Sequence, residues 1–287
     1  MPTRRARPLL GTLVDIRVDD ADAVRALIAI EAAFAEIAAV HRLMSFHEHD
    51  SDVSRINRDA SREPVSVDPR TREVIALALA IARASAGRFD PTIGAELVEW
   101  SLLPRPRDAP SPRADADWRD IQVLADGCIA CAKPLWIDLG GIAKGYAVDR
   151  AIERLVEHGI ASAVVNAGGD LRRIGTGFEP VHVRSPITQR PQRTLLLGEG
   201  AVASSGGDFE QARREDRMPG PHVDGVTRAS MPVGGAVTVI AYRCAIADAL
   251  TKIVIADADA AIPLLDAWNA QAITFRGAGW HQVGRAA

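Results

Sequence analysis

The sequence has few cysteines, no long apolar run and little net charge, and each of these shortages excludes a class of protein. Its three cysteines are a lone Cys-x-x-Cys pair, Cys128 and Cys131, and the distant Cys244. A zinc site needs a second pair of ligands, and no histidine is suitably spaced nearby, so we expect reduced thiols on a hairpin. No apolar run approaches the roughly 20 residues that a membrane-spanning helix needs. The net charge of −3 gives no reason to expect nucleic acid or an anionic membrane as a partner.

The first residues also lack the features of an export signal. Arg4 and Arg5 are basic, but neither an apolar stretch of signal-peptide length nor a small-residue cleavage site follows them. A strand-like run over residues 12–18 begins instead. We therefore expect a cytoplasmic protein without membrane insertion.

Two strong helical patterns and a series of short strand patterns organise the chain. Helices are expected at residues 22–43, where apolar side chains recur on one face, and at residues 69–86, which begin at Pro69 and end at Gly87. Short strands are expected in SAVVNAGGD, VHVRSP, TLLLG, AVASSG, AVTVIAY, AITFRG and GWHQVG, a helix in AIADALTKIVIA, and a surface excursion over residues 207–229. Hairpin-like strand neighbours and paired helices favour an α+β fold over a doubly wound parallel sheet. The 287 residues can hold one large domain or two small ones, and we detect no internal repeat.

The stretch WIDLGGIAKGYAVDR, residues 136–150, raises the first question about function. Its first two residues, Trp136 and Ile137, are interpreted as the end of a strand, and the apolar residues after the glycines recur at helical spacing. A glycine-rich turn leading into a helix presents backbone N–H groups to phosphate, and Lys144 could reach the same anion. The two glycines equally suit a tight turn or a close strand–helix contact. The spacing is neither that of the P-loop nor that of the dinucleotide fingerprint, so the local pattern alone favours the tight turn or close contact, and the other motifs have to decide.

Three further segments place small or polar residues next to predicted elements. NAGGDLR, residues 166–172, and ASSGGDFE, residues 203–210, are glycine-rich turns associated with strands. In ADALTK, the residues Asp248, Thr251 and Lys252 stand at positions i, i+3 and i+4 of a helix and share one face. Asp and Thr oxygens are hard ligands suited to Mg²⁺. An aspartate near a helix start is also a favourable partner of the helix dipole.

Together, seven segments resemble the ApbE-type flavin transferases, the FAD:protein FMN transferases. They are LLGTLVDIRV, MSFHEHDSDVSRIN, GRFDPTIGAEL, WIDLGGIAKGYAVDR, NAGGDLR, AVASSGGDFE and ADALTKIV, and they follow the family's order over residues 9 to about 255. The resemblance implies an α+β fold of duplicated two-layer, T-fold-like α/β units with antiparallel sheets, decorated by insertions. We expect residues 1–287 to form a single such domain, with two intertwined subdomains as the alternative.

The resemblance also implies a reaction. Family members bind FAD and use Mg²⁺ to transfer FMN to a Thr or Ser hydroxyl of an acceptor protein, releasing AMP. The implied acceptor motif is Asp-x-x-[Ser/Thr]-Gly-Ala-[Ser/Thr]. Some members hydrolyse FAD to FMN and AMP instead, and a third alternative is a protein that binds FAD without catalysis. Pyrophosphate cleavage needs an anion-binding site, a divalent ion and an activated hydroxyl, which is consistent with these motifs.

Position by position, the resemblance assigns roles to residues of these motifs. The Gly141 carbonyl, Asp248 and Thr251 are implied to bind Mg²⁺. His222, Asp248 and Lys252 are implied to take part in catalysis. The residues implied to contact FAD are Leu10, His47, Arg88, Phe89, Asp90, Asp138, Lys144 and Val223.

Several positions depart from the family's pattern. Leu10 replaces a usual Met and His47 a usual Tyr, changes that keep an apolar contact and a ring. Lys252 stands where a metal-binding Thr is usual, and a protonated lysine is no metal ligand. Either Thr251 takes over that role, or Lys252 supplies positive charge to the phosphates beside a more sparsely ligated ion. The motif HVDGVTR is one residue shorter than the family's His-x-x-Asp-Pro-x-Thr-Gly, so His222 is either the base that activates the acceptor hydroxyl or a surface histidine on a loop.

Overall fold

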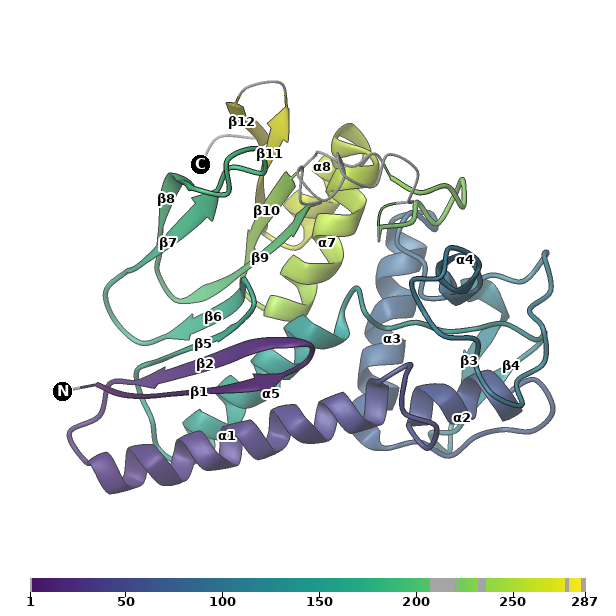
Figure 1. Cartoon of the computed structure of the whole chain (residues 1–287), viewed down its shortest axis with the longest axis horizontal. Coiled ribbons are helices and arrows are strands. Elements are labelled where there is room, and N and C mark those ends of the chain that lie inside the picture. Colours follow the sequence, from purple (N-terminus) through teal and green to yellow (C-terminus); the bar gives the residue numbers. More distant parts are fainter. Residues whose placement is uncertain (1, 207–219, 221, 232–235, 277–278, 285–287) are drawn as a thin grey trace.

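The computed structural model describes residues 2–206, 220, 222–231, 236–276 and 279–284 of the chain (Figure 1). The helices are α1 (Ala23–Met44), α2 (Asp52–Asp59), α3 (Pro69–Ala84), α4 (Gly94–Glu99), the 3₁₀ helix η1 (Trp118–Asp120), α5 (Ala143–Glu157), α7 (Cys244–Ala256) and α8 (Ala258–Ala267). The strands are β1 (Thr3–Leu9), β2 (Thr12–Val18), β3 (Ile121–Val123), β4 (Ile129–Cys131), β5 (Ala163–Ala167), β6 (Asp170–Ile174), β7 (Glu179–Arg184), β8 (Pro191–Leu197), β9 (Gly200–Gly206), β10 (Ala236–Ala241), β11 (Gln271–Arg276) and β12 (Gly279–Val283).

Eight of these strands form one sheet, and its order shows a duplication. The order is β1-β2-β5-β6-β9-β10-β11-β12, and each neighbouring pair is antiparallel. The first unit runs β1-β2-α1-α5-β5-β6, and the second repeats its order of two strands, two helices and two strands as β9-β10-α7-α8-β11-β12. The expected α+β fold of duplicated two-layer units is confirmed.

The helices of both units cover the sheet and enclose the core (Figure 1). Along β2, Val14, Ile16 and Val18 are fully buried while the residues between them are partly exposed, as expected for a strand with one face on the core. Helix α1 packs against α5 through its apolar face. The helices predicted at residues 22–43 and 69–86 are α1 and α3, which confirms both to within two residues at each end.

The segment between α1 and α5 is a large insertion at one end of the molecule (Figure 1). It holds α2, α3, α4, η1 and the two-stranded β3-β4 sheet. Cys128 lies in the turn between β3 and β4, and Cys131 ends β4, so the expected position of both cysteines on a hairpin is confirmed. Burial raises the pKa of Cys131 to about 12 and keeps this thiol protonated at neutral pH.

Trp136 and Ile137 lie in an extended segment and not in a strand, which corrects the interpretation of the sequence. The side chain of Asn57, on α2, makes the hydrogen bonds to Ile137 that the backbone of a neighbouring strand would otherwise make. Its amide donates to the Ile137 carbonyl at 3.0 Å, and its oxygen accepts from the Ile137 N–H at 2.6 Å. The next residue, Asp138, donates its N–H to the Pro91 carbonyl at 2.8 Å. These bonds satisfy a buried backbone without a sheet and hold the approach to α5 against the insertion.

Part of the predicted surface excursion over residues 207–229 lies outside the described residues, namely 207–219 and 221. Residues 222–231 contact the insertion, where the Gly225 N–H donates to the Arg88 carbonyl at 3.1 Å. Of the described helices, none is long and apolar enough to cross a bilayer.

Candidate active site

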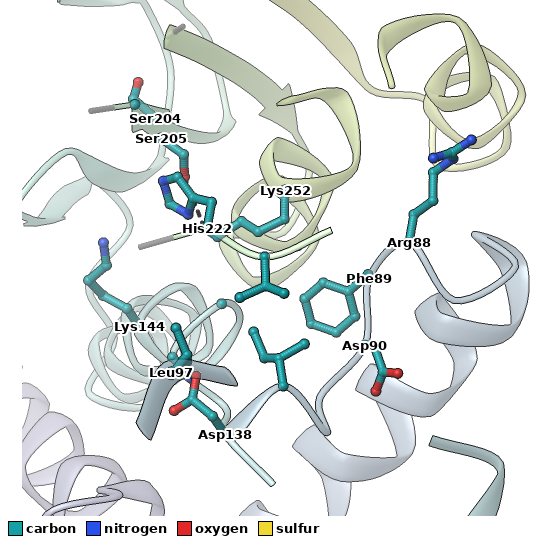
Figure 2. Close-up of a pocket in the computed structure, with 15 residues that line it drawn as sticks. Arg88, Phe89, Asp90, Leu97, Asp138, Lys144, Ser204, Ser205, His222 and Lys252 are labelled. Carbon is teal, nitrogen blue, oxygen red and sulfur yellow. Dashed lines mark hydrogen bonds between the residues drawn. The ribbon is translucent and has the colours of Figure 1, made fainter. Parts of the chain in front are cut away.

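A pocket of about 380 Å³ lies where the two units meet the insertion (Figure 2). It is lined by the loop before α4, the start of α5, the end of β9, the segment around residue 222, and α7. Most of the residues predicted to form the site line it together: Arg88, Phe89, Asp90, Asp138, Gly141, Lys144, His222, Val223 and Lys252.

Helices α5 and α7 come close together beside this pocket because α5 carries a glycine at the contact. A Cβ at Gly145 would lie 2.4 Å from the Cys244 carbonyl oxygen, a distance that no larger residue tolerates. The Gly145 N–H donates to Asp248 Oδ2 at 3.2 Å. The glycine of the Ala-Lys-Gly-Tyr sequence thus places the start of one helix against the polar face of the other.

The Lys252 ammonium lies at the centre of a largely buried polar cluster. Its Nζ is 2.5 Å from Asp248 Oδ1, 2.9 Å from Ser205 Oγ and 3.1 Å from Thr251 Oγ1. The Ser205 and Thr251 hydroxyl oxygens are 2.7 Å apart, and Thr251 donates to the Asp248 main-chain carbonyl at 2.6 Å. The side chains of Asp248 and Lys252 are only 1% and 15% exposed, so solvent and salt screen their attraction little.

A second lysine–carboxylate pair lies near the first. Lys144 Nζ is 2.8 Å from Oδ2 of Asp170, a residue of β6 that is 1% exposed. Burial, together with the charge of Asp248, raises the pKa of Asp170 to about 6 despite the attraction of Lys144. Asp170 and Asp248 therefore each have a lysine ammonium within ion-pair distance.

Asp138 begins the glycine turn that leads into α5. Its Oδ2 accepts from the Gly140 N–H at 3.1 Å, the arrangement of a tight turn, while the adjacent Gly141 lines the pocket. Burial raises the pKa of Asp138 to about 6, and the bond from Gly140 and the charges of His47 and Lys252 oppose the shift. The ionised form of this carboxyl is thus disfavoured by its position.

Replacing Asp138 by Asn is expected to raise the free energy of unfolding by up to about 3 kcal/mol above pH 7. The unfolded carboxyl releases its proton near pH 3.8 and the folded one near pH 6, so the parent protein loses stability as the pH rises through this window. Below about pH 4 the Asp138 carboxyl is protonated in both the folded and the unfolded state, so the gain in stability from Asp138→Asn should vanish. Urea unfolding at the two pH extremes measures the effect.

Asp50→Asn is the control for this experiment, because it removes the same charge from a side chain that is 95% exposed. We expect little change in stability from it at either pH. An Asp138→Asn gain of equal size at both extremes would show that burial of the charge is not its cause.

Residues 222–231 bring His222 to the pocket because they are held against the insertion. Gly225 approaches so closely that a Cβ there would lie 2.2 Å from a backbone carbonyl of the insertion. Arg228 donates to Asp90 Oδ2 at 2.7 Å, across a long stretch of sequence. The shortened loop that carries His222 is therefore held to the insertion by the contacts of Gly225 and Arg228.

His222 is partly buried and lines the pocket. Its pKa is lowered to about 4, chiefly by burial and next by the charge of Lys252, while Asp248 opposes the shift. The imidazole is therefore neutral at neutral pH, and one of its ring nitrogens carries a lone pair that can accept a proton.

Two residues predicted to contact FAD direct their charges away from the pocket (Figure 2). Arg88 reaches Asp257 at the start of α8, with 2.8 Å between Nη2 and Oδ2. The Asp90 carboxylate accepts from Arg228, as above, and from the Thr92 hydroxyl at 2.7 Å. Phe89, between them, turns its ring into the pocket. Arg88 and Asp90 hold neighbouring segments together in this structure.

Four other predicted residues are absent from the described lining of the pocket. Leu10 lies in the turn between β1 and β2, and His47 follows the end of α1. Asp248 and Thr251 lie on α7 behind Lys252, with exposed fractions of 1% and 0%. Asp248 and Thr251 affect the pocket by holding the Lys252 ammonium.

Three residues that sequence analysis did not single out have clear parts in the site: Ser205, Asp170 and Arg228. Ser205 contacts Lys252, Asp170 pairs with Lys144, and Arg228 holds the segment of His222. All three stand inside motifs that the sequence analysis quotes. Their partners lie in other motifs, so the motif residues themselves were the only available signal.

Comparisons with known proteins agree with these features. The model of the ApbE family matches residues 10–274. An FAD:protein FMN transferase of Treponema pallidum is 26% identical over 276 residues, which cover 86% of this chain and 76% of that protein. Another, from Vibrio cholerae, is 28% identical over 229 residues, covering 74% and 68%. The crystal structure of an ApbE protein from Thermotoga maritima has a TM-score of 0.81 at 26% identity and covers 98% of this chain and 97% of its own. The resemblance drawn from the seven motifs is confirmed.

Proposed function

Because the chain belongs to the ApbE family, we propose that it is an FAD:protein FMN transferase, which moves the FMN half of FAD to a protein. The proposal includes a Thr or Ser hydroxyl as acceptor, in a motif like Asp-x-x-[Ser/Thr]-Gly-Ala-[Ser/Thr], and AMP as the product released. One observation carries it: two lysines, a glycine turn at a helix start and a neutral imidazole converge on one pocket.

The pocket residues suit each part of this reaction. The acceptor hydroxyl oxygen forms a bond to the phosphorus of the FMN half, while the bridging oxygen leaves with AMP. His222 accepts the hydroxyl proton, because its imidazole is neutral at neutral pH. Lys144 and the start of α5 attract the phosphate oxygens. Phe89 offers an aromatic face to a ring of the dinucleotide.

The Mg²⁺ implied by the sequence resemblance fits the described donors poorly. Asp248 Oδ1 already accepts from Lys252, and its Oδ2 accepts from the Gly145 N–H. The Thr251 hydroxyl donates to the Asp248 carbonyl, and its two lone pairs accept from Ser205 and from Lys252. We therefore assign no step of the reaction to a metal, and dependence on Mg²⁺ stays a prediction from the sequence.

Incubation with FAD and an acceptor that carries the motif is expected to add the mass of FMN to the acceptor and to release an equal amount of AMP. An acceptor with Ala in place of the modified Ser or Thr is the control, because it lacks the attacking oxygen. Free FMN and AMP beside an unmodified acceptor would support the hydrolase alternative. Bound but intact FAD would support a non-catalytic FAD-binding protein, and failure to bind FAD would contradict all three.

A further inference from the structure

We propose that the Lys252 ammonium takes the place of a divalent cation in this site, so that the chain binds and cleaves FAD without a metal. The inference rests on the proposed function for its substrate. Its structural basis is the set of atoms that surrounds this one side chain.

Lys252 lies among the three residues that the sequence assigns to Mg²⁺. Its Nζ is 2.5 Å from Asp248 Oδ1 and 3.1 Å from Thr251 Oγ1. Its aliphatic stem passes Gly141, where a Cβ would lie 3.6 Å from Lys252 Cε. The ammonium therefore contacts two of the three residues assigned to the ion, Asp248 and Thr251, and its stem passes the third.

The hydroxyl groups of the cluster are oriented to accept from an ammonium. Thr251 donates to a main-chain carbonyl, so in the Ser205–Thr251 pair it is Ser205 that donates. The Ser205 oxygen is then left to accept from Lys252 at 2.9 Å. An ammonium has three N–H donors, and three acceptor oxygens surround this one.

One of the three acceptors can be exchanged for a phosphate. Ser205 lines the pocket, whereas Asp248 and Thr251 are buried behind it. A phosphate oxygen that enters the pocket can replace the Ser205 hydroxyl, while the other two oxygens keep the ammonium in place. An ammonium–phosphate hydrogen bond carries charge on both partners and is stronger than the ammonium–hydroxyl bond it would replace.

The charges of the cluster disfavour a second cation. Asp248 lies within ion-pair distance of Lys252, and Asp170 of Lys144, so each buried carboxylate already has a cation of the chain beside it. A divalent ion at Asp248 would meet an ammonium held against the same carboxylate in a region of low dielectric constant. If the ion displaced Lys252 from Asp248, the mostly buried ammonium would lose its carboxylate partner, which is energetically costly.

In the cleavage step Lys252 acts as a hydrogen-bond donor. Its N–H donates to a phosphate oxygen and stabilises the charge that develops as the bridging oxygen leaves with AMP. The proton of the acceptor hydroxyl goes to His222, as in the proposed function. The step therefore balances without a further ion.

The experiment compares the parent protein with three variants, each in excess EDTA and in excess MgCl₂. Flavin fluorescence gives FAD affinity, and chromatography gives AMP release. We expect the parent to perform equally in both solutions. Lys252→Gln removes the charge and should lower AMP release roughly 10²–10³-fold in EDTA. Lys252→Thr leaves Asp248 as an unpaired carboxylate beside a hydroxyl and should recover AMP release only with MgCl₂. Lys133→Gln removes a lysine outside the pocket and should match the parent.

Calorimetric titration with MgCl₂ in the absence of FAD is an independent readout, in which Lys252→Thr should bind Mg²⁺ more tightly than the parent.

A parent whose FAD binding or AMP release requires MgCl₂ would overturn the inference and leave the proposed function intact. Lys252→Gln with parental activity would also overturn it. If the parent neither binds nor cleaves FAD in any solution, the proposed function fails. The titration then decides the inference, and equal Mg²⁺ affinity in parent and Lys252→Thr overturns it. Melting curves show that each variant is folded.

Discussion

Replacing Asp149 by Ala is expected to lower the free energy of unfolding by about 3–5 kcal/mol, the cost typical of breaking a buried ion pair. Asp149, on α5, is fully buried. Its Oδ1 accepts from Arg172 Nη1 at 2.8 Å and from the Cys244 N–H at 2.9 Å, and its Oδ2 from the Ala245 N–H at 3.0 Å. The Ala variant leaves Arg172, whose side chain is 10% exposed, without its counter-charge.

The same carboxylate caps helix α7 from a neighbouring helix. The residue at the N-cap of α7, Arg243, makes no side-chain capping bond, so Asp149 satisfies the first N–H groups of α7 and complements its dipole. Losing the cap contributes about 1 kcal/mol. Because α7 carries Asp248 and Lys252, we also expect the variant to lose FAD cleavage at temperatures where the parent is fully active.

Urea unfolding of two further variants tests whether burial of the ion pair explains the large loss of stability expected for Asp149→Ala. Asp115→Ala breaks an ion pair of the same length, 2.8 Å to Arg113, but both side chains are more than half exposed, and the expected loss of stability is much smaller. Asp149→Asn keeps one accepting oxygen and should fall between the two. A loss in Asp149→Ala no larger than in Asp115→Ala would contradict the role assigned to this carboxylate.

Elements with strong local patterns were predictable from the sequence, and those that depend on distant partners were not. Residues 22–43 have an apolar stripe long enough to indicate a helix by themselves, and α1 confirms it. Trp136 and Ile137 are apolar and extended, which resembles a strand locally. The partner of Ile137 is the side chain of Asn57, 80 residues away, and no local pattern indicates such a bond. The duplication is equally hidden, because residues 45–142 separate the two helices of the first unit.

The candidate active site likewise combines features that local sequence patterns predict with features that depend on distant partners. The glycine turn before α5 and the polar face of α7 are local patterns, and Asp138, Lys144 and Lys252 do line one pocket. The directions of charged side chains are set by long-range partners. Asp90 turns to Arg228, which lies 138 positions along the chain, and so serves the loop instead of the pocket. Such pairings follow from the packing of the insertion against residues 222–231.

Replacing Asp248 by Ala is expected to lower FAD cleavage by roughly 10²–10³-fold, the range for losing one positioned electrostatic group. The carboxylate holds Lys252 at 2.5 Å and accepts the Gly145 N–H at 3.2 Å. Without it the ammonium loses its counter-charge and its fixed place, and α5 loses a bond to α7. AMP release in a single turnover measures cleavage. FAD affinity should fall less, because the variant still carries the positive charge of Lys252.

Asp248→Asn separates the charge of this residue from its hydrogen bonding. Its amide oxygen can still accept from Gly145, so the melting temperature should stay close to that of the parent. A neutral amide attracts the Lys252 ammonium far less, so we expect cleavage nearer to that of Asp248→Ala than to that of the parent. Asp266→Ala removes an exposed carboxylate from α8 and controls for the loss of charge alone. Parental cleavage in Asp248→Ala would refute a role for the carboxylate. Full recovery in Asp248→Asn would show that the site needs the bond to Gly145 and not the charge that positions Lys252.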